Sequence, residues 1–342
     1  MAESKGTLAD VAAQAGVSVP TVSKVLNGKS DVAPATRAKV YDAIESTGYL
    51  TKRAAPRDSS GVLELLIEGA DSPWALEVIR GAEGAAATRG SALIVTSSVH
   101  DSFSIDRWTE SLRARRSAGA VVVLPSEGDG VLKALKQLRI PVVLVDPAGW
   151  EGADFPTVGA TNWSGGFEAT NRLIELGHRD IGLIAGPSRL ASALERQEGY
   201  AAALRRAGLP DRTELVADGE FRMSGGYAAG AALLDLDARP TAIFSSSDQQ
   251  AAGLYEAARE RDIRIPAELS VIGFDDTVLS RHLSPALTTI HQPLTEMAAE
   301  AVRLISELCS DPSSHAARRI ELTTYLVERR SAIALTSPTP TR

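Results

Sequence analysis

Residues 7–28 contain two short stretches of helical apolar periodicity separated by a glycine. In the first stretch, apolar side chains recur at i, i+3, i+4 and i+7, at Leu8, Val11, Ala12 and Ala15. Thr7, with Asp10 three residues later, is placed to cap this helix, and Gly16 is placed to end it. The spacing therefore predicts one short amphipathic helix that stops at a glycine turn.

A second helix is expected directly after the turn, because Ser18 is a good cap and Pro20 is tolerated in a first helical turn. Its inward-facing residues are Val22, Val25 and Leu26. A third helix is expected from about Pro34 to Thr47, with Gly48 as its stop. Its apolar side consists of Val40, Ala43, Ile44 and Thr47. The pattern predicts a helix-turn-helix with its own small core.

This segment resembles the DNA-binding domain of the lactose-repressor family. The resemblance rests on the runs Thr7–Ala12, Ala15–Ser18, Thr21–Asn27, Thr36–Arg37 and Gly48–Tyr49. Two helices packed for some other purpose would explain the apolar spacing, but not the polar residues at fixed places. The family implies operator DNA as a partner, contacted by Thr7, Ser18, Val19, Pro20, Thr21, Ser23, Lys24, Asn27 and Thr36. In that arrangement Val19 and Pro20 touch base edges, and Lys24 reaches guanine or a phosphate.

Residues 50–61 lack periodicity and are polar, basic and interrupted by proline, so we interpret them as a linker. Lys52, Arg53 and Arg57 are expected to hold phosphates or to enter a narrow minor groove. A flexible tether with incidental charge is the alternative. Relatives usually place a leucine wedge where this chain has Asp58, and a carboxylate cannot serve as that wedge.

Composition agrees with a DNA-binding end on an acidic body. The chain has 342 residues, 44% hydrophobic and 23% charged, with a net charge of −7, as expected of a globular protein of two or three domains. Residues 1–60 carry 8 Lys and Arg against 6 Asp and Glu, whereas the remainder carries 28 against 37. Binding of DNA is therefore expected at one end only.

The single cysteine, Cys309, excludes an internal disulfide framework and agrees with a reducing compartment. It falls on an amphipathic helix, where packing is the simplest role and redox sensing the alternative. The sequence shows neither a signal-peptide pattern nor an apolar stretch of membrane-spanning length. We expect a cytoplasmic protein with no membrane partner.

From residue 62 onward, apolar runs alternate with helical stretches, which is typical of parallel sheets. Helices are expected at Trp74–Thr88, Asn162–Leu176 and Ala191–Ala207. Strands are expected at Val62–Ile67, Ala92–Thr96, Ala120–Leu124, Pro141–Val145, Ile181–Ile184, Thr241–Phe244 and Leu269–Phe274. A stretch of this length exceeds one comfortable doubly wound domain, so two sheets are expected.

Residues 62–330 resemble the effector-binding core of the same family, through Leu176–Ile181, Gly199–Tyr200, Arg239–Ile243, Val271–Asp276 and Leu287–Pro293. The implied architecture is an all-α helix-turn-helix domain (1–49), a linker (50–61), an α/β periplasmic-binding-protein-like core with parallel sheets (62–333), and a tail (334–342). Lobe 1 would comprise about 62–158 and 291–320, and lobe 2 about 159–290 and 321–333. The implied assembly is a homodimer on an approximately palindromic operator. Pro338 and Pro340 argue against a tail that forms a tetramer.

Ligands of open parallel sheets bind at the carboxyl ends of strands, so residues there are candidates for an effector site. Asp146, Ser247, Asp248 and Asp275 follow expected strands, and carboxylates can accept pairs of sugar hydroxyls. The resemblance implies hydroxyl binding by Asp275 and Arg196 and packing of Phe221 on the ligand. Ser247 stands where many relatives have asparagine, so this resemblance does not specify the sugar.

Each effector candidate also has a structural alternative. Asp146, Asp248 and Asp275 could cap the helices that follow them. The aromatic candidates, Trp74, Phe221 and Trp163, could instead be packing residues. Purine bases remain an alternative ligand class, since some relatives bind them in this cleft.

Enzyme chemistry finds little support, because the five histidines form no metal-spaced pair and neither a Gly-x-Ser-x-Gly motif nor a phosphate-binding glycine loop is present. No catalytic residue, metal or cofactor is predicted. A sugar-binding protein without a regulatory role is the alternative function, but an exported one would have a signal peptide and no helix-turn-helix. The sequence thus predicts a ligand-responsive transcriptional regulator, and it leaves inducer and corepressor action both open.

Overall fold

The computed structural model describes residues 8–26, 32–33, 36, 39–40, 43, 61–99, 103–123, 129–138, 140–147, 149, 155–210, 212–311 and 318–335. The chain divides into two compact units, Met1–Ser59 and Ser60–Arg342, which we call the head and the core. The third expected helix is described only in part, and residues 50–60 of the expected linker and 336–342 of the expected tail lie outside the described residues.

The head contains α1 (Leu8–Ala15) and α2 (Val19–Leu26), joined by a turn at Gly16. Gly16 has a φ of +65°, the left-handed conformation that favours glycine at a helix end. Ser18 Oγ accepts a hydrogen bond from the Thr21 backbone N–H at 3.3 Å and so caps α2. The small core consists of Val11, Ala12, Ala15, Val22, Val25, Val32, Val40 and Ala43. The expected helix-turn-helix packing is confirmed for these residues.

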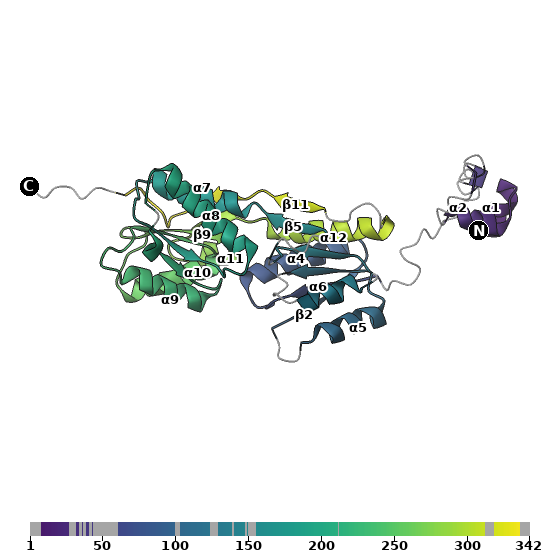
Figure 1. The fold of residues 1–342 in the computed structure, drawn as a ribbon, viewed down its shortest axis with the longest axis horizontal. Coiled ribbons are helices and arrows are strands. Elements are labelled where there is room, and N and C mark those ends of the chain that lie inside the picture. Colours follow the sequence, from purple (N-terminus) through teal and green to yellow (C-terminus); the bar gives the residue numbers. More distant parts are fainter. Residues whose placement is uncertain are drawn as a thin grey trace, which may run out of the picture. The chain divides into compact units, whose positions relative to one another are not determined.

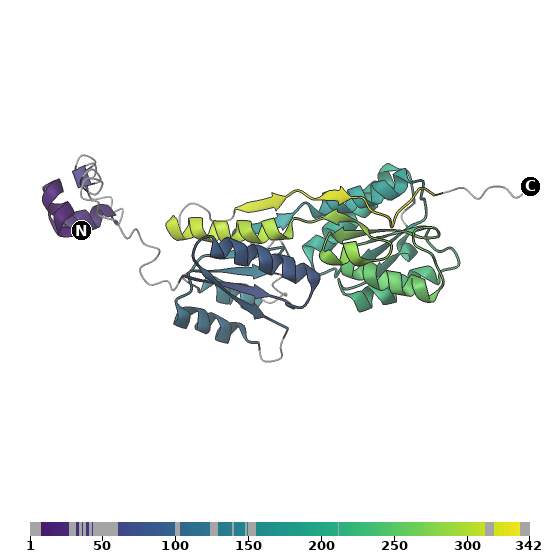
Figure 2. The same cartoon turned by 180° about the vertical axis from the view of Figure 1, so that it is seen from behind.

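The core contains two six-stranded sheets. The first runs in the order β11-β5-β4-β3-β1-β2 and is parallel throughout. Its strands are β1 (Val62–Ile67), β2 (Ala92–Ser97), β3 (Gly119–Val123), β4 (Val142–Val145), β5 (Thr157–Ala160) and β11 (Arg319–Leu322). One face packs against α4 (Pro73–Ala87) and α12 (Leu294–Ser310), and the other against α5 (Ile105–Arg115) and α6 (Asp129–Lys136). We call this sheet with its helices lobe 1; Figure 2 shows α12 lying beside α4.

The second sheet runs in the order β12-β10-β9-β8-β6-β7, and only β12 is antiparallel to its neighbour. Its strands are β6 (Ile181–Ala185), β7 (Val216–Asp218), β8 (Ala242–Ser245), β9 (Ser270–Asp275), β10 (Thr288–His291) and β12 (Tyr325–Val327). Its helices are α7 (Asn162–Glu175), α8 (Ala191–Arg206), α9 (Met223–Leu234), α10 (Asp248–Glu260) and α11 (Val278–His282), with a 3-10 turn at Thr213–Leu215. The pair α7 and α8 covers one face and α9 with α10 the other (Figure 1), and we call this assembly lobe 2.

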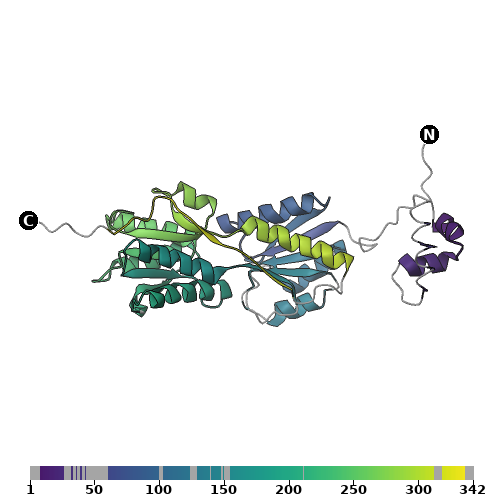
Figure 3. The same cartoon turned by 90° about the horizontal axis from the view of Figure 1, so that it is seen from above.

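The chain passes between the lobes three times, after β5, after β10 and after β11. Figure 3 shows the C-terminal crossing as a long extended segment that runs from one lobe to the other. Both lobes are therefore joined along one side, and the carboxyl ends of their parallel strands flank the space between them.

The seven strands expected from the sequence are all present, with ends shifted by at most one residue where both ends are described. Leu124, the expected end of β3, lies outside the described residues. Five further strands were not predicted from the sequence; they have three or four residues each and are β5, β7, β10, β11 and β12. β4 and β8 also have four residues, but they form apolar runs, whereas most of the five missed strands are interrupted by polar residues.

Cys309 is half-buried on α12, where its Sγ lies 3.4 Å from the Ala118 carbonyl oxygen, and burial raises the pKa of its thiol. This environment agrees with a packing role, because a redox-sensing cysteine needs thiolate character. Across the described stretches of the chain, every helix is too short or too polar to cross a membrane.

Candidate functional site

The first turn of α2 forms the exposed end of the helix-turn-helix. Ser18, Val19 and Pro20 are all exposed there, and 41% of Val19 is accessible although it is a large apolar residue. Lys24 is exposed one turn later, whereas Thr21, Ser23 and Thr36 are half-buried. An exposed apolar residue beside polar groups at a helix N-terminus is suited to base edges in a DNA groove. Five further DNA-contact candidates lie outside the described residues: Thr7, Asn27, Lys52, Arg53 and Arg57.

A cavity of about 420 Å³ lies between the two lobes of the core. Its wall combines residues that follow strands with residues from the first turns of α4, α8, α9 and α10. Six of the eight predicted effector residues line it: Trp74, Asp146, Arg196, Phe221, Ser247 and Asp275. The structure therefore brings together side chains that are up to two hundred residues apart in sequence.

Arg196 forms the buried floor of this cavity, with only 3% of its surface exposed. Its guanidinium stacks on the Phe274 ring, with the central carbon 3.7 Å from the ring centre. Its nitrogens donate hydrogen bonds at 2.6–2.9 Å to three acceptors: Asn162 Oδ1, the Ser246 carbonyl oxygen and Gln292 Oε1. A fourth, longer contact of 3.4 Å reaches Asp275 Oδ1. Burial lowers the pKa of Arg196, and the nearby carboxylates oppose that shift. The planar fork is thus fixed in one orientation before any ligand arrives.

Asp275 and Asp146 face the cavity from the ends of β9 and β4, one in each lobe. Both have left-handed backbones, with φ of +105° for Asp275 and +44° for Asp146, which non-glycine residues rarely adopt. Burial raises the pKa of both carboxyl groups, although Arg196 opposes the shift. The contact from Arg196 to Asp275 is long, at 3.4 Å, so this carboxylate keeps capacity to accept a hydroxyl hydrogen.

Ser247 and Asp248 differ in their relation to the cavity. Ser247 lines it, but its hydroxyl already accepts from the Gln250 backbone N–H at 3.2 Å and donates to Gln250 Oε1 at 3.1 Å. Asp248 does not line it, because its carboxylate accepts from the backbone and hydroxyl of Thr277 and from Thr289. These hydrogen bonds fix the start of α11 beside β10, and contact of Asp248 with the effector stays a prediction. Asp248 does not cap α10, since Ser247 does so.

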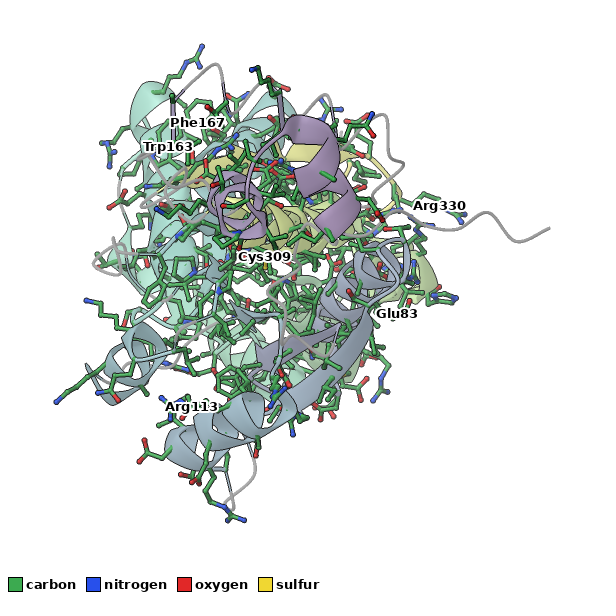
Figure 4. All side chains as sticks on the ribbon, turned by 90° about the vertical axis from the view of Figure 1, so that its right-hand side faces the viewer. Glu83, Arg113, Trp163, Phe167, Cys309 and Arg330 are labelled. Atoms are coloured by element: carbon green, nitrogen blue, oxygen red, sulfur yellow. The ribbon has the colours of Figure 1, made fainter. Side chains whose placement is uncertain are left out.

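The aromatic candidates also separate. Phe221 and Trp74 line the cavity from lobe 2 and lobe 1. Trp163 does not: it is 44% exposed and stacks on Phe167, with ring centres 5.4 Å apart. Figure 4 shows these two rings together at the surface of the molecule. Trp163 therefore lies at the surface outside this cavity, and its contact with the effector stays a prediction.

Phe221 is held in place by the backbone of lobe 2. Glu220 and Phe221 have φ of +53° and +54°, so two consecutive residues adopt the left-handed conformation. The ring fills the space above Gly186, where an added Cβ would lie 2.3 Å from two ring carbons. Helix α7 packs equally closely against α8: an added Cβ on Gly166 of α7 would lie 2.2 Å from the carbonyl oxygen of Arg196 on α8. Glycine at these positions lets Phe221 and Arg196 reach the cavity.

Several functional candidates were not predicted from the sequence. Gln292 and Asn162 hold Arg196, and Ser192 lines the cavity one helical turn before Arg196 on α8. The i, i+4 spacing of Ser192 and Arg196 was a usable signal, because such residues share a helix face. Gln292 directly follows β10, and it was missed because β10 itself was not predicted.

Two family models match the chain. One, described as bacterial regulatory proteins, lacI family, matches residues 7–52, and the other, a periplasmic binding protein-like domain, matches residues 170–332. The ribose operon repressor of Escherichia coli (strain K12) is 34% identical over 332 residues, covering 95% of this chain and 99% of the relative. The chain belongs to the LacI family of bacterial regulatory proteins. Its head and core are thus those of a LacI-family DNA-binding transcriptional regulator, as the sequence predicted.

Other similar proteins agree with this assignment. The repressor PurR of Yersinia pestis (strain Pestoides F) is 35% identical over 333 residues, covering 95% of this chain and 96% of the relative. Among solved structures, the regulator CelR in complex with cellobiose has a TM-score of 0.74 and 31% identity, covering 95% of this chain and 99% of that one. The lac repressor dimer bound to operator has a TM-score of 0.71 and 25% identity, covering 97% and 100%. These LacI-family relatives are regulators rather than enzymes.

Proposed function

We propose that this LacI-family protein is a cytoplasmic, dimeric repressor whose effector is a neutral saccharide bound between the lobes. The observation that carries the proposal is the cavity floor, where buried Arg196 lies beside Asp275 and Gln292 and where Asp146 completes the wall from the other lobe. Carboxylates accept hydrogen bonds from pairs of adjacent hydroxyls, and a fixed guanidinium donates hydrogen bonds to them. Phe221 and Trp74 offer apolar ring faces for the sugar.

The charge of the floor favours a neutral ligand over an anionic one. Asp146 and Asp275 are both buried beside the guanidinium of Arg196. A sugar phosphate or sugar acid would add a further negative charge in a poorly solvated space. A hydroxyl group adds none and satisfies the carboxylates.

The names of the relatives support a sugar, since one binds cellobiose and another regulates a ribose operon. Purine bases remain the alternative ligand class, since the flat ring of Phe221, which lines the cavity, offers a surface on which such a base can stack. A binding protein without a regulatory role is disfavoured by the exposed first turn of α2.

The proposed mechanism links the ligand to DNA through the two lobes. Ligand contacts from both sides change how far the lobes close, and in a dimer this alters the spacing of the two heads on an approximately palindromic operator. We assign residues 1–49 to the DNA-binding domain, 50–61 to the linker, 62–333 to the core and 334–342 to the tail. Lys52, Arg53 and Arg57 then contact DNA phosphates or the minor groove.

A ligand screen with a DNA readout tests this proposal. Thermal unfolding is followed with neutral mono- and disaccharides, sugar phosphates and purine bases, and each stabilising compound is then added to the protein bound to a selected operator. We expect stabilisation by a neutral saccharide, a change in operator affinity, and loss of both responses in Asp275→Ala. Stabilisation by purine bases alone would assign the cavity to a base, and unaltered operator affinity with every binder would overturn the regulatory role.

A further inference from the structure

Gln292 occupies the segment where the chain passes from β10 of lobe 2 to α12 of lobe 1. It is almost fully buried, with 1% of its surface exposed. Its backbone N–H donates to the Asp275 carbonyl oxygen at 3.2 Å, so the residue is fixed to the end of β9. The backbone of Gln292 is therefore fixed beside the cavity floor, in the segment that crosses from lobe 2 to lobe 1.

The two ends of the Gln292 amide bind different lobes. Its Oε1 accepts from the Arg196 guanidinium at 2.9 Å, and its Nε2 donates to Asp146 Oδ2 at 2.8 Å. Arg196 lies on α8 of lobe 2, and Asp146 follows β4 of lobe 1. Arginine only donates and an ionised carboxylate only accepts, so the amide can satisfy both partners in one orientation alone.

Both partners of this amide also line the cavity. A ligand that takes hydrogen bonds from Arg196 or gives them to Asp146 must share those groups with Gln292. We propose that Gln292 is the positioning residue that couples effector occupancy to the orientation of the two lobes, a proposal that rests on the function proposed above. The hydrogen bonds that join Asp275, Arg196, Gln292 and Asp146 connect the two lobes, and a bound ligand rearranges them.

The chemistry of the site explains why an amide is needed. A glutamate at 292 would still accept from Arg196, but it would place a second carboxylate against Asp146. A methionine would fill a similar volume next to Met297, whose Sδ lies 3.7 Å from Gln292 Nε2, and would bind neither partner. These two substitutions therefore remove the connection in different ways while keeping the length of the side chain.

The first test measures lobe orientation without any ligand. Spin labels are placed at exposed Arg113 of lobe 1 and Arg205 of lobe 2 in a Cys309→Ser background of the full chain, and the distribution of distances between them is recorded. We expect a narrow distribution in the parent protein and a broader one in Gln292→Met and Gln292→Glu. Gln137→Met, the same exchange at an exposed position after α6, is the matched control and should leave the distribution narrow.

A compensating pair separates a connection from simple packing. In Gln292→Glu with Asp146→Asn, the new amide donates to the new carboxylate while Arg196 still donates to it, so the link is restored with its polarity reversed. We expect this double variant to regain a narrow distribution that Gln292→Glu alone lacks. A parent-like distribution in both single variants, or failure of the double variant to narrow it, would overturn the proposal.

The second test measures coupling with ribose and cellobiose as probes. Operator affinity is measured with and without each sugar, and the ratio, typically about 5- to 150-fold in allosteric proteins, should fall to within about threefold of unity in Gln292→Met. An unchanged ratio would contradict the proposal. If neither sugar binds the parent protein, ribose and cellobiose are ruled out as effectors, while the label distances still decide the role of Gln292.

Discussion

The guanidinium carbon of Arg196 lies over the Phe274 ring, 3.7 Å from its centre. Gly165 approaches the same ring, since an added Cβ there would lie 2.6 Å from a Phe274 carbon. The cation is thus held between an aromatic surface and its polar partners. A cation in this position cannot turn to follow a ligand, so the ligand has to match it.

Removal of this cation should destabilise the core strongly. Arg196→Ala leaves Asp275 and Asp146 buried without their counter-charge, so the free energy of unfolding should fall by about 3 to 5 kcal/mol. Urea unfolding of the full chain measures the change. Arg205→Ala, an exposed arginine on the same helix, is the control and should cost under about 0.5 kcal/mol. A loss below about 1 kcal/mol in Arg196→Ala would contradict a buried ionic role.

The fit between Gly186 and Phe221 predicts an effect on ligand binding at a residue that carries no side chain. Gly186→Ala forces the Phe221 ring away from the cavity wall, so affinity for the saccharide should drop by about tenfold. Calorimetric titration measures it. Phe221→Ala added to Gly186→Ala should lower affinity little further, because both changes remove one ring contact.

Gly84 provides the control for that substitution. It lies in α4, and an added Cβ there meets nothing within 4 Å. Gly84→Ala should raise the free energy of unfolding by about 0.5 to 1 kcal/mol and leave saccharide affinity unchanged. Equal losses of affinity in the two alanine variants would show that the Phe221 ring does not contribute.

Asp248 predicts how stability depends on pH. Burial raises the pKa of its carboxyl to about 7, against an ordinary aspartate value near 4. Between about pH 4 and pH 7 the folded protein therefore holds a proton that the unfolded chain has released, so the contribution of this group to stability falls as pH rises from about 4 and levels off above about 7. Asp248→Asn should remove about 1 kcal/mol of the loss between pH 6 and pH 8, measured by urea unfolding. An identical loss in the variant and the parent would assign the pH dependence to other groups.

Two valines of α2 separate DNA contact from folding of the head. Val19 is exposed and Val22 is fully buried, three residues apart. Val19→Ala should keep the head folded and weaken operator binding by about fivefold, because an apolar contact to a base is reduced. Val22→Ala should instead destabilise the head by roughly 2 kcal/mol, which hydrogen exchange of the head amides will report. Loss of exchange protection in Val19→Ala would place that residue in the core.

The linker predicts a weak operator kink. Asp58 stands where a leucine wedge is usual, so Asp58→Leu should tighten operator binding and increase the bend measured by energy transfer between the ends of the DNA. The proposed contacts of Lys52, Arg53 and Arg57 with phosphates predict that operator binding by the parent protein weakens steeply with salt. A strong bend in the parent with no gain in Asp58→Leu would mean that another residue inserts into the groove.

The sequence predicted what is periodic or adjacent to a strand. The apolar faces of α1 and α2 and the strands that form apolar runs gave a recognisable pattern, and Asp275 and Asp146 were found because they lie at the ends of such strands. Arg196 and Phe221 came from resemblance alone, since nothing local marks them. Gln292 was missed because β10 is short and polar.

Side-chain direction could not be predicted in the same way. Asp248 follows β8 as expected, yet its carboxyl group turns towards Thr277 and Thr289. Thr277 precedes α11 and Thr289 lies on β10, and both elements come later in the chain. Trp163 begins α7, but which side of the helix meets α8 depends on Gly166 and Gly199 in close contact. Both outcomes are decided by tertiary packing between distant segments.

Because the chain crosses between the lobes three times, the segments of lobe 1 and lobe 2 are synthesised in alternation. Lobe 2 emerges largely as one continuous stretch, whereas the lobe 1 core needs Met297, Val302 and Ile305 of α12, and its sheet edge needs β11. At about 5 to 20 residues per second, one face of the first sheet waits roughly 8 to 30 s for its second helix. During translation, therefore, the sheet that forms first is the last to be covered, and contact with other nascent chains is most dangerous in that interval.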